Sequence, residues 1–451
     1  MEQIDQLRAY GLFDARVPRY TSYPPANHFA AETDASHQSE WLHAVPYGAE
    51  VSIYIHIPFC KRLCWFCACR TQGTKTLWPV DVYVNVLLQE IALVAQRLPD
   101  DVRMARLHLG GGTPTILSPQ TMTRLLSRVF DTFQKAEGFE FSVEIDPTEA
   151  ATELLETLAA HGMNRASIGV QDFNPKVQEA IGRVQTYEQT HDCIEILRGA
   201  KVHSLNMDLL YGLPHQTQTT LVSTLEQVLA LQPDRLALYG YAHVPWMSKR
   251  QVMIDSEALP SAEARYALTE TAQRMLVMDG FRPIGIDHFA RPGDNLALAS
   301  HSGGLRRNFQ GYTDDRAAVL IGLGASAISQ FPQGYVQNRS ATAAYTSAIG
   351  QGCLAGARGH VLSAEDRLTA RMIEHLMCRF GIDVDALDAE FPQQRTIILQ
   401  AVAELVAAYP AACRTDGTNM QILRAFAPLV RVIAGHLDRY RAGQMAHSSA
   451  I

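Results

Sequence analysis

Short apolar segments alternate with amphipathic segments between residue 51 and about residue 290. The apolar segments have the length and composition of buried strands, and those between them have helical periodicity. This alternation is typical of a parallel sheet covered by helices. The predicted strands are VSIYIHIP (51–58), RLHLGGG (106–112), FSVEIDP (141–147), RASIGVQDF (165–173), SLNMDLLYGLP (204–214), RLALYGYAHVP (235–245) and FRPIGIDHFA (281–290).

The amphipathic segments predict the helices that cover this sheet. One of them begins with Ser118 as a potential N-cap and Pro119 at the first helical position, where proline is well tolerated. After Gly359 the pattern becomes helical and predicts a separate small helical domain. The predicted helices are 81–99, 118–133, 151–162, 220–232, 261–280, 363–380, 395–409 and 421–443.

The predicted strands share a second feature at their carboxyl ends. Most end in glycine or polar residues, as in HIPFC, GGGTPT, VEIDP, VQDF, MDLLYGLP and IDHF. One such end could serve only to stop a strand, but parallel α/β folds place their active sites at this edge. The repetition over successive strands indicates one shared site. It favours a full or partial TIM-like (β/α) barrel of parallel strands over an open sheet.

The residues before the first strand have a different character. PRYTSYPP (18–25) is too rich in Pro and Tyr for a regular element. Its tyrosines favour an extended arm packed on the main domain over a free tail. We therefore expect an arm over residues 1–45, a catalytic barrel over 46–355 and a helical domain over 360–451.

Composition narrows the classes of function. The chain has 451 residues and a formal net charge of −7, which gives no footprint for nucleic acid or an anionic membrane. No apolar run of 18 residues is evident that would predict a membrane span, and the N-terminus lacks the apolar stretch of a signal peptide. We expect a cytoplasmic protein and a monomer.

The spacing of the cysteines supplies the candidate chemistry. Of eight cysteines, four lie within residues 60–69, and the others are scattered singly, as inert buried thiols are. The cluster has the form Cys60-x3-Cys64-x2-Cys67. A zinc site would need a second pair of ligands, and none appears downstream. Three thiolates suit a [4Fe–4S] cluster in which one iron is open to a small molecule that chelates it, and they suit it better than they suit a plain ferredoxin site.

The residues around the cysteines resemble a known superfamily. YIHIPFCKRLCWFCAC (54–69) is similar to the cluster motif of radical S-adenosylmethionine (SAM) enzymes. GGGTPT (110–115) is similar to their glycine-rich strand, whose backbone meets the amino group of SAM. With PRYTSYPP, SVEIDP, GVQDF, MDLLYGLP, YAHVP, GIDHFARP and NFQGYT, these motifs resemble the oxygen-independent coproporphyrinogen III oxidase family over most of the chain.

This resemblance implies a demanding reaction. Two propionate side chains of coproporphyrinogen III become vinyl groups, which gives protoporphyrinogen IX and CO2 without oxygen. An electron from the cluster cleaves SAM, and the 5′-deoxyadenosyl radical takes a hydrogen atom from the propionate β-carbon. The family thus implies a [4Fe–4S] cluster, two molecules of SAM, and an electron donor and acceptor that the sequence does not identify.

The resemblance also implies cofactor contacts at matching positions. Taken singly, Glu144 or Asp208 could be a satisfied strand-end carboxylate, and Arg183 could form a surface ion pair. Gln171 alone could bond the neighbouring backbone. The residues that match contacts to the cluster-bound SAM are Tyr54, Gly111, Glu144 and Ile328. Those that match contacts to the second SAM are Phe66, Gly112, Thr113, Gln171, Arg183, Asp208 and Ala242.

Candidates for catalysis or substrate binding carry a weaker signal. His56 could be a core histidine. Cys69 lies two residues beyond Cys67, so we do not expect it to bind the cluster, although a role near the substrate is open. Arg19, Lys61 and Arg62 could meet substrate propionates, although we expect Lys61 to face solvent. The candidates are His56, Cys69, Tyr20, Tyr23 and His288.

Other functions have to be weighed against this one. Heme chaperones and anaerobic heme-degrading radical SAM methyltransferases share the barrel and cluster but generally lack the Cys67-x-Cys69 ending and the PRYTSYPP arm. The cluster loop departs from the commonest family pattern at Trp65, Ala68 and Arg70, none of which removes a ligand. A different class is nucleic-acid binding through the last predicted helix, with Arg424, Arg431, Arg439 and Arg441. The apolar residues among these arginines and the acidic net charge favour a packing or lid role.

Overall fold

The predicted strands join one twelve-stranded sheet in the computed structural model of the chain, which describes residues 3–441 and 450–451. Residues such as Leu109, Phe141 and Ile168 are fully buried in it, which explains the nearly continuous apolar runs. The parallel strands are, in spatial order, β13 (Val319–Leu323), β1 (Glu50–Ile57), β4 (Arg103–Gly111), β5 (Gln134–Ile145), β6 (Arg165–Gln171), β7 (Ser204–Tyr211) and β8 (Arg235–Gly240).

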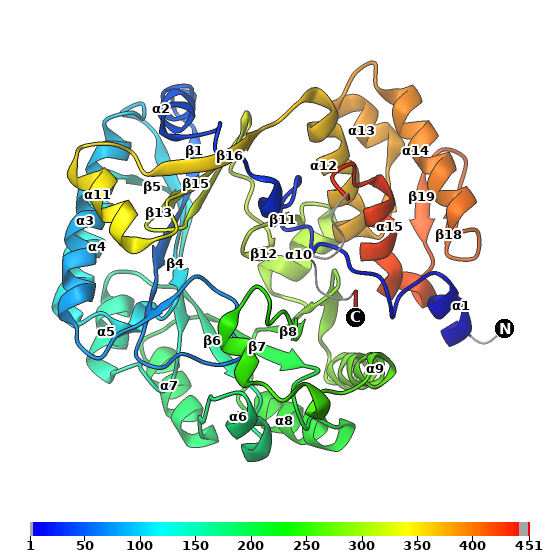
Figure 1. Cartoon of the computed structure of the whole chain (residues 1–451), viewed down its shortest axis with the longest axis horizontal. Helices are drawn as coiled ribbons and strands as arrows, with labels where there is room; N and C mark the ends of the chain where they lie inside the picture. Colours follow the sequence, from blue (N-terminus) through cyan, green and yellow to red (C-terminus); the bar gives the residue numbers. More distant parts are fainter. Residues whose placement is uncertain (1–2, 442–449) are drawn as a thin grey trace.

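Helices cover the outer face of the parallel strands (Figure 1). The predicted helices of this region are confirmed, and α4 is capped as expected, because the N–H of Thr121 donates to Oγ of Ser118 at 3.1 Å. Helices α6 and α7 were not among those predicted. The covering helices are α3 (Trp78–Ala95), α4 (Pro119–Thr132), α5 (Thr152–Ala160), α6 (Pro175–Ala180), α7 (Tyr187–Gly199), α8 (Gln218–Ala230) and α9 (Ala262–Met278).

Antiparallel strands extend the sheet at both ends and leave the barrel open. FRPIGIDHFA forms two short antiparallel strands instead of the single parallel strand that the sequence predicted. The described strands at the two ends of the sheet do not pair with each other, so the barrel is partial. The extending strands are β9 (Arg282–Ile284) and β10 (His288–Ala290) at one end, and β14 (Ile328–Phe331), β15 (Gly334–Asn338) and β16 (Gly356–Val361) at the other.

A buried hydrogen-bond network fixes β13, a strand that the sequence pattern did not single out. Glu90 of α3 accepts hydrogen bonds from the N–H of Gly324 at 2.6 Å, the hydroxyl of Tyr345 at 2.6 Å and Nδ2 of Asn338 at 2.7 Å. Burial raises the pKa of Glu90 to about 7 despite these donors. The network ties α3 to the loop after β13 and to α11 (Thr342–Gly350).

The C-terminal region is helical, as predicted, and it also contains a three-stranded antiparallel sheet. The predicted helix 421–443 is not continuous, because it begins as a strand and a 3-10 turn that contains Pro428. Its residues 442–443 lie outside the described residues. The elements are α12 (Ala364–Arg379), β17 (Gly381–Ile382), α13 (Val384–Glu390), α14 (Arg395–Ala408), β18 (Cys413–Thr415), β19 (Met420–Ile422), η5 (Arg424–Leu429) and α15 (Val430–Leu437).

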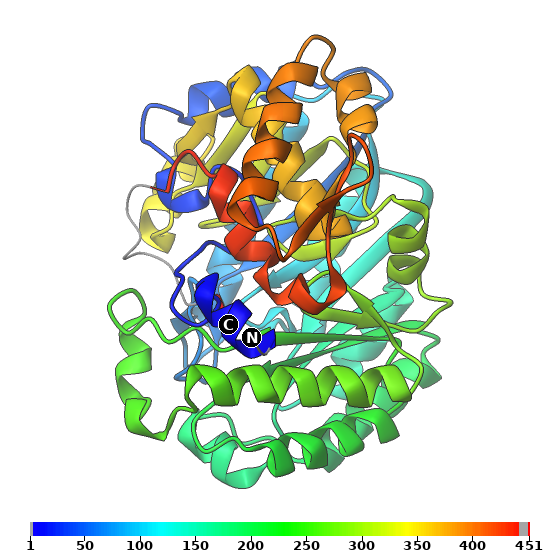
Figure 2. The same cartoon turned by 90° about the vertical axis from the view of Figure 1, so that its right-hand side faces the viewer.

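The N-terminal arm packs mainly on this C-terminal region (Figures 1 and 2). Helix α1 (Gln3–Ala9) and the two tyrosines of PRYTSYPP share its buried core. Arg431 of α15 donates hydrogen bonds to the carbonyls of Val17 at 2.5 Å and Pro18 at 3.1 Å. Helix α2 (Ala35–His43) packs instead on the barrel, through Trp41. The arm therefore bridges two parts of the fold.

Helix α3 is the single described helix long and apolar enough to cross a membrane, by length and composition. The sequence pattern had not singled it out for this property. Its mean hydropathy is 1.3, and 44% of its residues are buried inside the structure. Its apolar side chains, including Val84, Leu87 and Ile91, belong to the main core. A core helix passes the same test, so this helix is weak evidence for a span.

Candidate functional site

The cysteine loop follows directly on β1 and is fixed at its base. Two short strands, β2 (Phe59–Cys60) and β3 (Gln72–Gly73), pair in parallel beneath it. The N–H of Gln72 donates to the carbonyl of Pro58 at 2.7 Å. All cysteines of the loop are free thiols. The backbone is thus held from both ends, while the sulfur atoms are left to bind a ligand.

A segment after β8 holds the outer side of this loop. Oγ of Ser248 donates to the carbonyl of Cys67 at 3.0 Å, and Nε2 of Gln251 donates to that of Phe66 at 2.8 Å. This segment, η3 (Lys249–Met253), contains no motif, and sequence reasoning missed it. The only signal was its position after the polar strand end YAHVP.

The loop and the carboxyl ends of the strands enclose a cavity of about 190 Å³. Most of the predicted site residues meet there, as expected for the carboxyl edge of a parallel sheet. The predicted residues that line it are Cys60, Cys64, Cys67, Cys69, Phe66, Gly111, Gly112, Thr113, Glu144, Gln171, Arg183 and Asp208. Other residues that line it are Arg62, Leu63, Thr71, Ile145, Asp146, Ser167, Gly169 and Arg250.

The glycine-rich end of β4 brings its backbone to the cavity. Gly111 has a φ of +109°, a conformation that favours glycine. A Cβ atom on Gly112 would lie 2.6 Å from the carbonyl of Phe59, so any side chain would displace the cysteine loop. The N–H groups of Gly112 and Thr113 donate to the carbonyls of Ile57 and Phe59 at 2.8 and 2.9 Å. The glycines therefore set the distance between β4 and the loop.

Two carboxylates at strand ends differ in their electrostatics. Glu144 accepts a hydrogen bond from the N–H of Gly111 at 3.1 Å and lies 3.4 Å from Nε2 of His108. Burial alone would raise the pKa of Glu144, but His108 and the Gly111 N–H outweigh it and lower the pKa. Asp208 accepts from Ser167 at 2.9 Å and Asn206 at 2.8 Å, and burial still raises its pKa. Glu144 is thus the better anion of the two.

Arg183 and Gln171 complete the lining of the cavity. The guanidinium of Arg183 pairs with Asp146 at 3.0 Å and lies 3.7 Å from Sγ of Cys64. Its Nε is buried and has no hydrogen-bond partner among the described residues. Gln171 has a φ of 68°, at a register shift between β6 and β7. A strained backbone of this kind is typical of binding sites, where the fold must aim a side chain. Asp146 belongs to the VEIDP motif but was not among the predicted site residues.

Cys69 differs from the three candidate ligands. Its backbone N–H donates to Sγ of Cys67 at 3.4 Å. A hydrogen bond from the Cys69 thiol lowers the pKa of Cys67 to about 6, whereas the pKa of Cys69 is raised. Cys69 therefore supports a thiolate at Cys67, and its exclusion from the ligand set stays a prediction.

The remaining predicted residues do not line this cavity. Tyr54 lies on β1, where its hydroxyl is 3.0 Å from Nδ1 of His56. The carbonyl of Ala242 accepts a hydrogen bond at 3.1 Å from Nε2 of Gln251, which also donates to the cysteine loop. Ile328 begins β14, on the far side of β13. The substrate candidates outside the cavity are His56, Tyr20, Tyr23 and His288, of which the tyrosines lie where the arm meets the C-terminal region.

The donor set fits a cluster that leaves one iron for SAM. In the part of the chain that the structure describes, no three His, Cys, Asp or Glu side chains are grouped around a single metal ion. The cysteines instead line one wall of a cavity, which suits a cluster whose ligands bind separate irons. The same cavity holds the Glu144 carboxylate and the orphan Nε of Arg183, which are suited to the polar groups of SAM.

Comparison with known proteins agrees with this class of site. The family model described as the radical SAM superfamily matches residues 54–228. This range holds the cysteine loop and the strand ends that face it. Fold and site thus define a radical SAM protein, and that class implies a [4Fe–4S] cluster and SAM.

Relatives over the full length specify the family. The chain is 51% identical over 451 residues, 100% of both chains, to "Oxygen-independent coproporphyrinogen III oxidase" of Paracoccus denitrificans. It is 50% identical, again over 100% of both, to "Coproporphyrinogen III oxidase, anaerobic 1" of Cereibacter sphaeroides. The solved coproporphyrinogen III oxidase of Escherichia coli superposes with a TM-score of 0.89 at 34% identity, over 94% of this chain and 97% of that one. The chain belongs to the oxygen-independent coproporphyrinogen III oxidase family.

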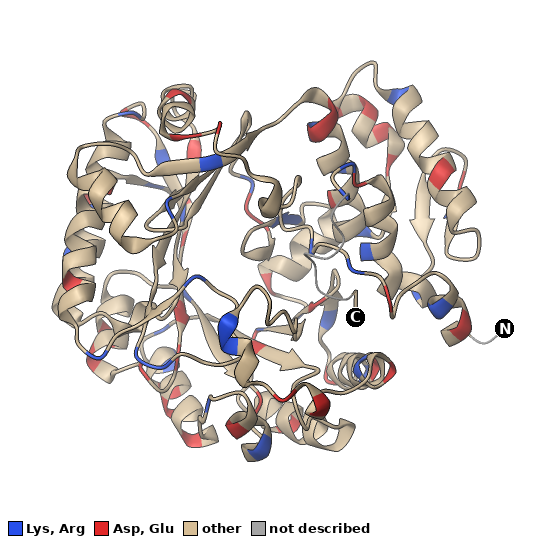
Figure 3. Cartoon of the chain, viewed as in Figure 1, with Lys and Arg blue, Asp and Glu red and all other residues tan. Residues whose placement is uncertain are grey.

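The surface gives no support to nucleic-acid binding. Figure 3 shows both signs of charge interspersed over the helices, the C-terminal ones included. Arg431 is buried, and Arg439 pairs with Glu365. A continuous basic stripe, the electrostatic footprint of nucleic-acid binding, is therefore not formed by these arginines.

Proposed function

We propose that this chain converts two propionate side chains of coproporphyrinogen III to vinyl groups without oxygen and so forms protoporphyrinogen IX in heme biosynthesis. One observation carries the proposal. The loop cysteines line the same cavity as Glu144, Asp208 and Arg183, in a chain whose full-length relatives carry the corresponding name. The reaction makes the chain an oxidoreductase.

Cys60, Cys64 and Cys67 would hold the [4Fe–4S] cluster. When bound, the cluster and SAM supply the electron and the 5′-deoxyadenosyl radical that takes hydrogen from the propionate β-carbon. The chain's own part is to bind and orient these groups and to exclude water from them. Glu144 would accept hydrogen bonds from the ribose hydroxyls, and Arg183 would pair with the carboxylate of a SAM molecule.

The proposal includes two molecules of SAM. Tyr54, Gly111, Glu144 and Ile328 would contact the first. The residues assigned to the second are Phe66, Gly112, Thr113, Gln171, Arg183, Asp208 and Ala242. Equilibrium dialysis of the cluster-loaded protein with labelled SAM tests this point: two molecules per chain are expected, and one would refute the second site.

Other parts of the proposal concern the whole chain. The arm (1–45), the barrel (46–355) and the C-terminal domain (360–451) would together enclose a large substrate. His56, Cys69, Tyr20, Tyr23 and His288 are proposed near the substrate or its path. An electron donor and an electron acceptor are required as partners. We propose a cytoplasmic monomer.

Anaerobic turnover tests the function directly. Reconstituted, reduced protein is incubated with coproporphyrinogen III and SAM under argon, and the porphyrins are separated after oxidation. Divinyl product, CO2 and 5′-deoxyadenosine are expected. Tight heme binding without vinyl product would support a chaperone instead, and heme opening would support the methyltransferase class.

A further inference from the structure

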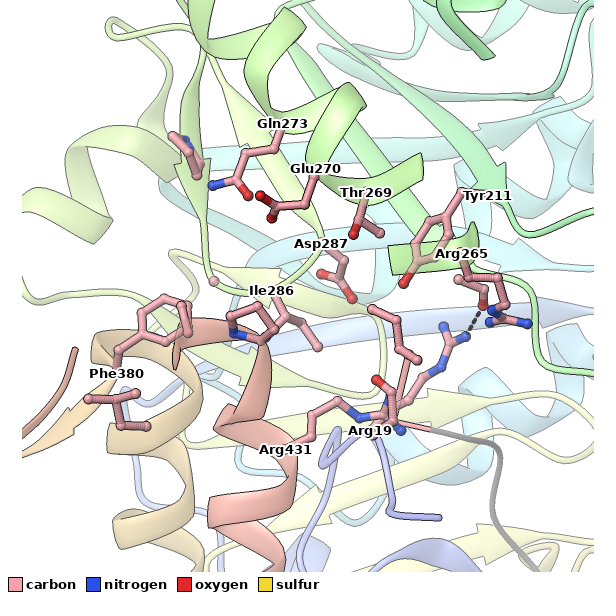
Figure 4. Close-up of a pocket in the computed structure, with 18 of the residues that line it drawn as sticks. Arg19, Tyr211, Arg265, Thr269, Glu270, Gln273, Ile286, Asp287, Phe380 and Arg431 are labelled. Atoms are coloured by element: carbon pink, nitrogen blue, oxygen red, sulfur yellow. Dashed lines mark hydrogen bonds between the residues drawn. The ribbon is translucent and has the colours of Figure 1, made fainter. Parts of the chain in front are cut away.

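A second and larger cavity lies beside the first, between the barrel and the C-terminal region. Its volume is about 440 Å³. It opens at the carboxyl ends of β7 and β8, under α9, and the arm contributes Arg19 to its wall (Figure 4). None of the residues that match SAM or cluster contacts lines it. This cavity therefore has a different ligand chemistry.

Its lining is strongly cationic. Four arginines (Arg19, Arg265, Arg424 and Arg431) line it, together with the acidic side chains of Glu270 and Asp287 and the C-terminal residue Ile451. Asp287 already binds Nδ1 of His288 at 2.7 Å. Burial and the neighbouring charges of Arg19 and Arg307 lower the pKa of Arg431 to about 10. The arginines outnumber the acidic side chains of this lining, which suits a ligand that carries carboxylates.

The fold makes room for one of these guanidinium groups. A Cβ atom on Gly212 would lie 3.1 Å from Cζ of Arg265, and one on Gly240 would lie 3.3 Å from its Nη2. Arg265 stacks on the ring of Tyr211, with 5.8 Å between Cζ and the ring centroid. Nη2 donates to the carbonyl of Tyr241 at 2.8 Å, whereas Nε is buried without a partner in the described parts of the chain. Arg265 is thus held in place with a donor unused.

Arg19 lies beside it in a similar setting. Its Nη2 donates to the carbonyl of Gly240 at 2.5 Å, and its guanidinium lies 5.8 Å from the ring centroid of Tyr239. In Figure 4 the side chain of Arg19 extends from beside Arg431 toward Arg265. Arg431 donates hydrogen bonds to the arm backbone next to Arg19 and to the carbonyl of Ala450. It therefore adds positive charge to the cavity and holds the backbone that carries Arg19.

Charged residues from the walls of both cavities act on the same side chain, that of Tyr239. Burial raises the pKa of Tyr239, Asp208 and Asp287 raise it further, and Arg307 and Arg19 act in the opposite direction. Asp208 lines the cysteine cavity, whereas Asp287 and Arg19 line the cationic one. The hydroxyl of Tyr239 lies 3.4 Å from Nε2 of His288.

We propose that Arg19 and Arg265 bind the carboxylates of those propionate side chains that are not reacting, while the reacting propionate lies at the cysteine cavity. This inference rests on the proposed function, which supplies a substrate with several propionates. Guanidinium forks match carboxylates in shape and charge. Ile286, Phe380 and Ile422 add an apolar wall for the edge of the macrocycle.

Binding and turnover by point variants test the inference. Arg265→Gln and Arg19→Gln should each raise the Kd for coproporphyrin III, and the KM for coproporphyrinogen III, about tenfold, because each loses one charge-assisted contact. Arg265→Lys should lose less. Arg274→Gln, at an exposed position of the same helix outside this cavity, is the matched control. Iron content and SAM cleavage by dithionite-reduced protein should match wild type in all four.

A second measurement does not depend on any variant. Wild-type holoenzyme should bind coproporphyrin III much more tightly than its tetramethyl ester, and Arg265→Gln should shrink this difference. Equal binding of acid and ester by wild type would overturn the inference, as would an unchanged Kd in both glutamine variants. Failure of wild type to form vinyl product would instead refute the proposed function, because porphyrin binding is read separately.

Discussion

The two cavities at the carboxyl edge of the sheet are built in different ways. The cysteine cavity draws most of its walls from the cysteine loop and the strand ends of one barrel, and its groups are four thiols, three carboxylates and three arginines. The cationic cavity draws its walls from the arm, α9 and the C-terminal region, which are far apart in the sequence. The first is set by backbone contacts that no side chain could replace, such as those of Gly112.

This difference separates two tasks. Radical chemistry needs a cluster and SAM at fixed distances, so its residues belong to short motifs on rigid strands. Recognition of a large, multiply charged substrate needs space that can open, and surfaces between parts of a fold supply it. The variants below should therefore affect one cavity and spare the other.

The largest effect is expected from Cys64→Ser. Removal of one of three thiolates should abolish cluster binding and all SAM cleavage, because a hydroxyl is a poor ligand for iron in such a cluster. Iron content and the EPR signal of the reduced protein measure this loss. Cys69→Ser should retain iron, and so should the control Cys353→Ser at an exposed position. Loss of iron in Cys69→Ser would show that its exclusion from the ligand set is wrong.

A smaller effect should follow Glu144→Gln. The variant keeps an acceptor for the Gly111 N–H but loses the charge that His108 supports. We expect the Kd for SAM to rise roughly a hundredfold at most, with normal iron content, since hydrogen bonds to charged groups contribute about 1.5–3 kcal/mol. Glu137→Gln, at an exposed position of the same strand, is the control. Unchanged SAM affinity would remove Glu144 from the proposed contacts, while an altered Kd for coproporphyrin III would break the separation of the two cavities.

The motif-bearing parts of the fold were predictable from the sequence. Strands such as β1 and β4 carry continuous apolar runs that end in glycine or polar residues, and both the strands and their common edge were predicted. Strand β13 was missed because VLIGL is short and no amphipathic helix precedes it. The hairpin β9–β10 was predicted as one strand because the turn between its two strands does not interrupt the apolar pattern. Gly285 lies in this turn, with a φ of 57°.

Local sequence patterns also do not show which distant segments meet, and this explains the site residues that sequence reasoning missed. Twelve predicted residues meet in the cysteine cavity, and all but Arg183, which lies between α6 and α7, belong to a strand end or to the loop that follows one. Ser248 and Gln251 support the loop from a turn whose place depends on tertiary packing. Arg265 lies in a helix and looks like any solvated arginine of an amphipathic pattern. Its contacts with Tyr211 and Tyr241 at the ends of β7 and β8 could be known only once the helix was placed on the sheet.

An intermediate effect, confined to the cationic cavity, should follow Gly240→Ala. The new Cβ atom would lie 2.8 Å from the Tyr211 hydroxyl and would displace it together with Arg265. Both contacts are the far ends of side chains, so the protein should fold, and the KM for coproporphyrinogen III should rise a few-fold with unchanged SAM affinity. Gly199→Ala is the control, because a Cβ atom there would meet nothing within 4 Å. A loss of SAM affinity in Gly240→Ala would mean that the cavities do not act separately.

The smallest effect on activity is expected from Glu90→Gln, which touches neither cavity but changes how stability depends on pH. The pKa of Glu90 is about 7 in the folded protein against an ordinary value of 4.5, so the folded state binds a proton more tightly than the unfolded one. Its contribution to stability is therefore full below about pH 4.5 and is lost as the pH rises to about 7. The loss is on the order of 3 kcal/mol, because one pKa unit corresponds to about 1.4 kcal/mol.

Urea unfolding of wild type and Glu90→Gln at a series of pH values measures this contribution. The stability of wild type relative to the variant should fall between about pH 4.5 and pH 7 and stay level above that range, while SAM cleavage and porphyrin binding match wild type. Gln89→Glu, at the adjacent position outside the buried network, is the control and should show no such slope. A constant difference between wild type and Glu90→Gln would mean that Glu90 stays charged on folding, with its three donors outweighing burial.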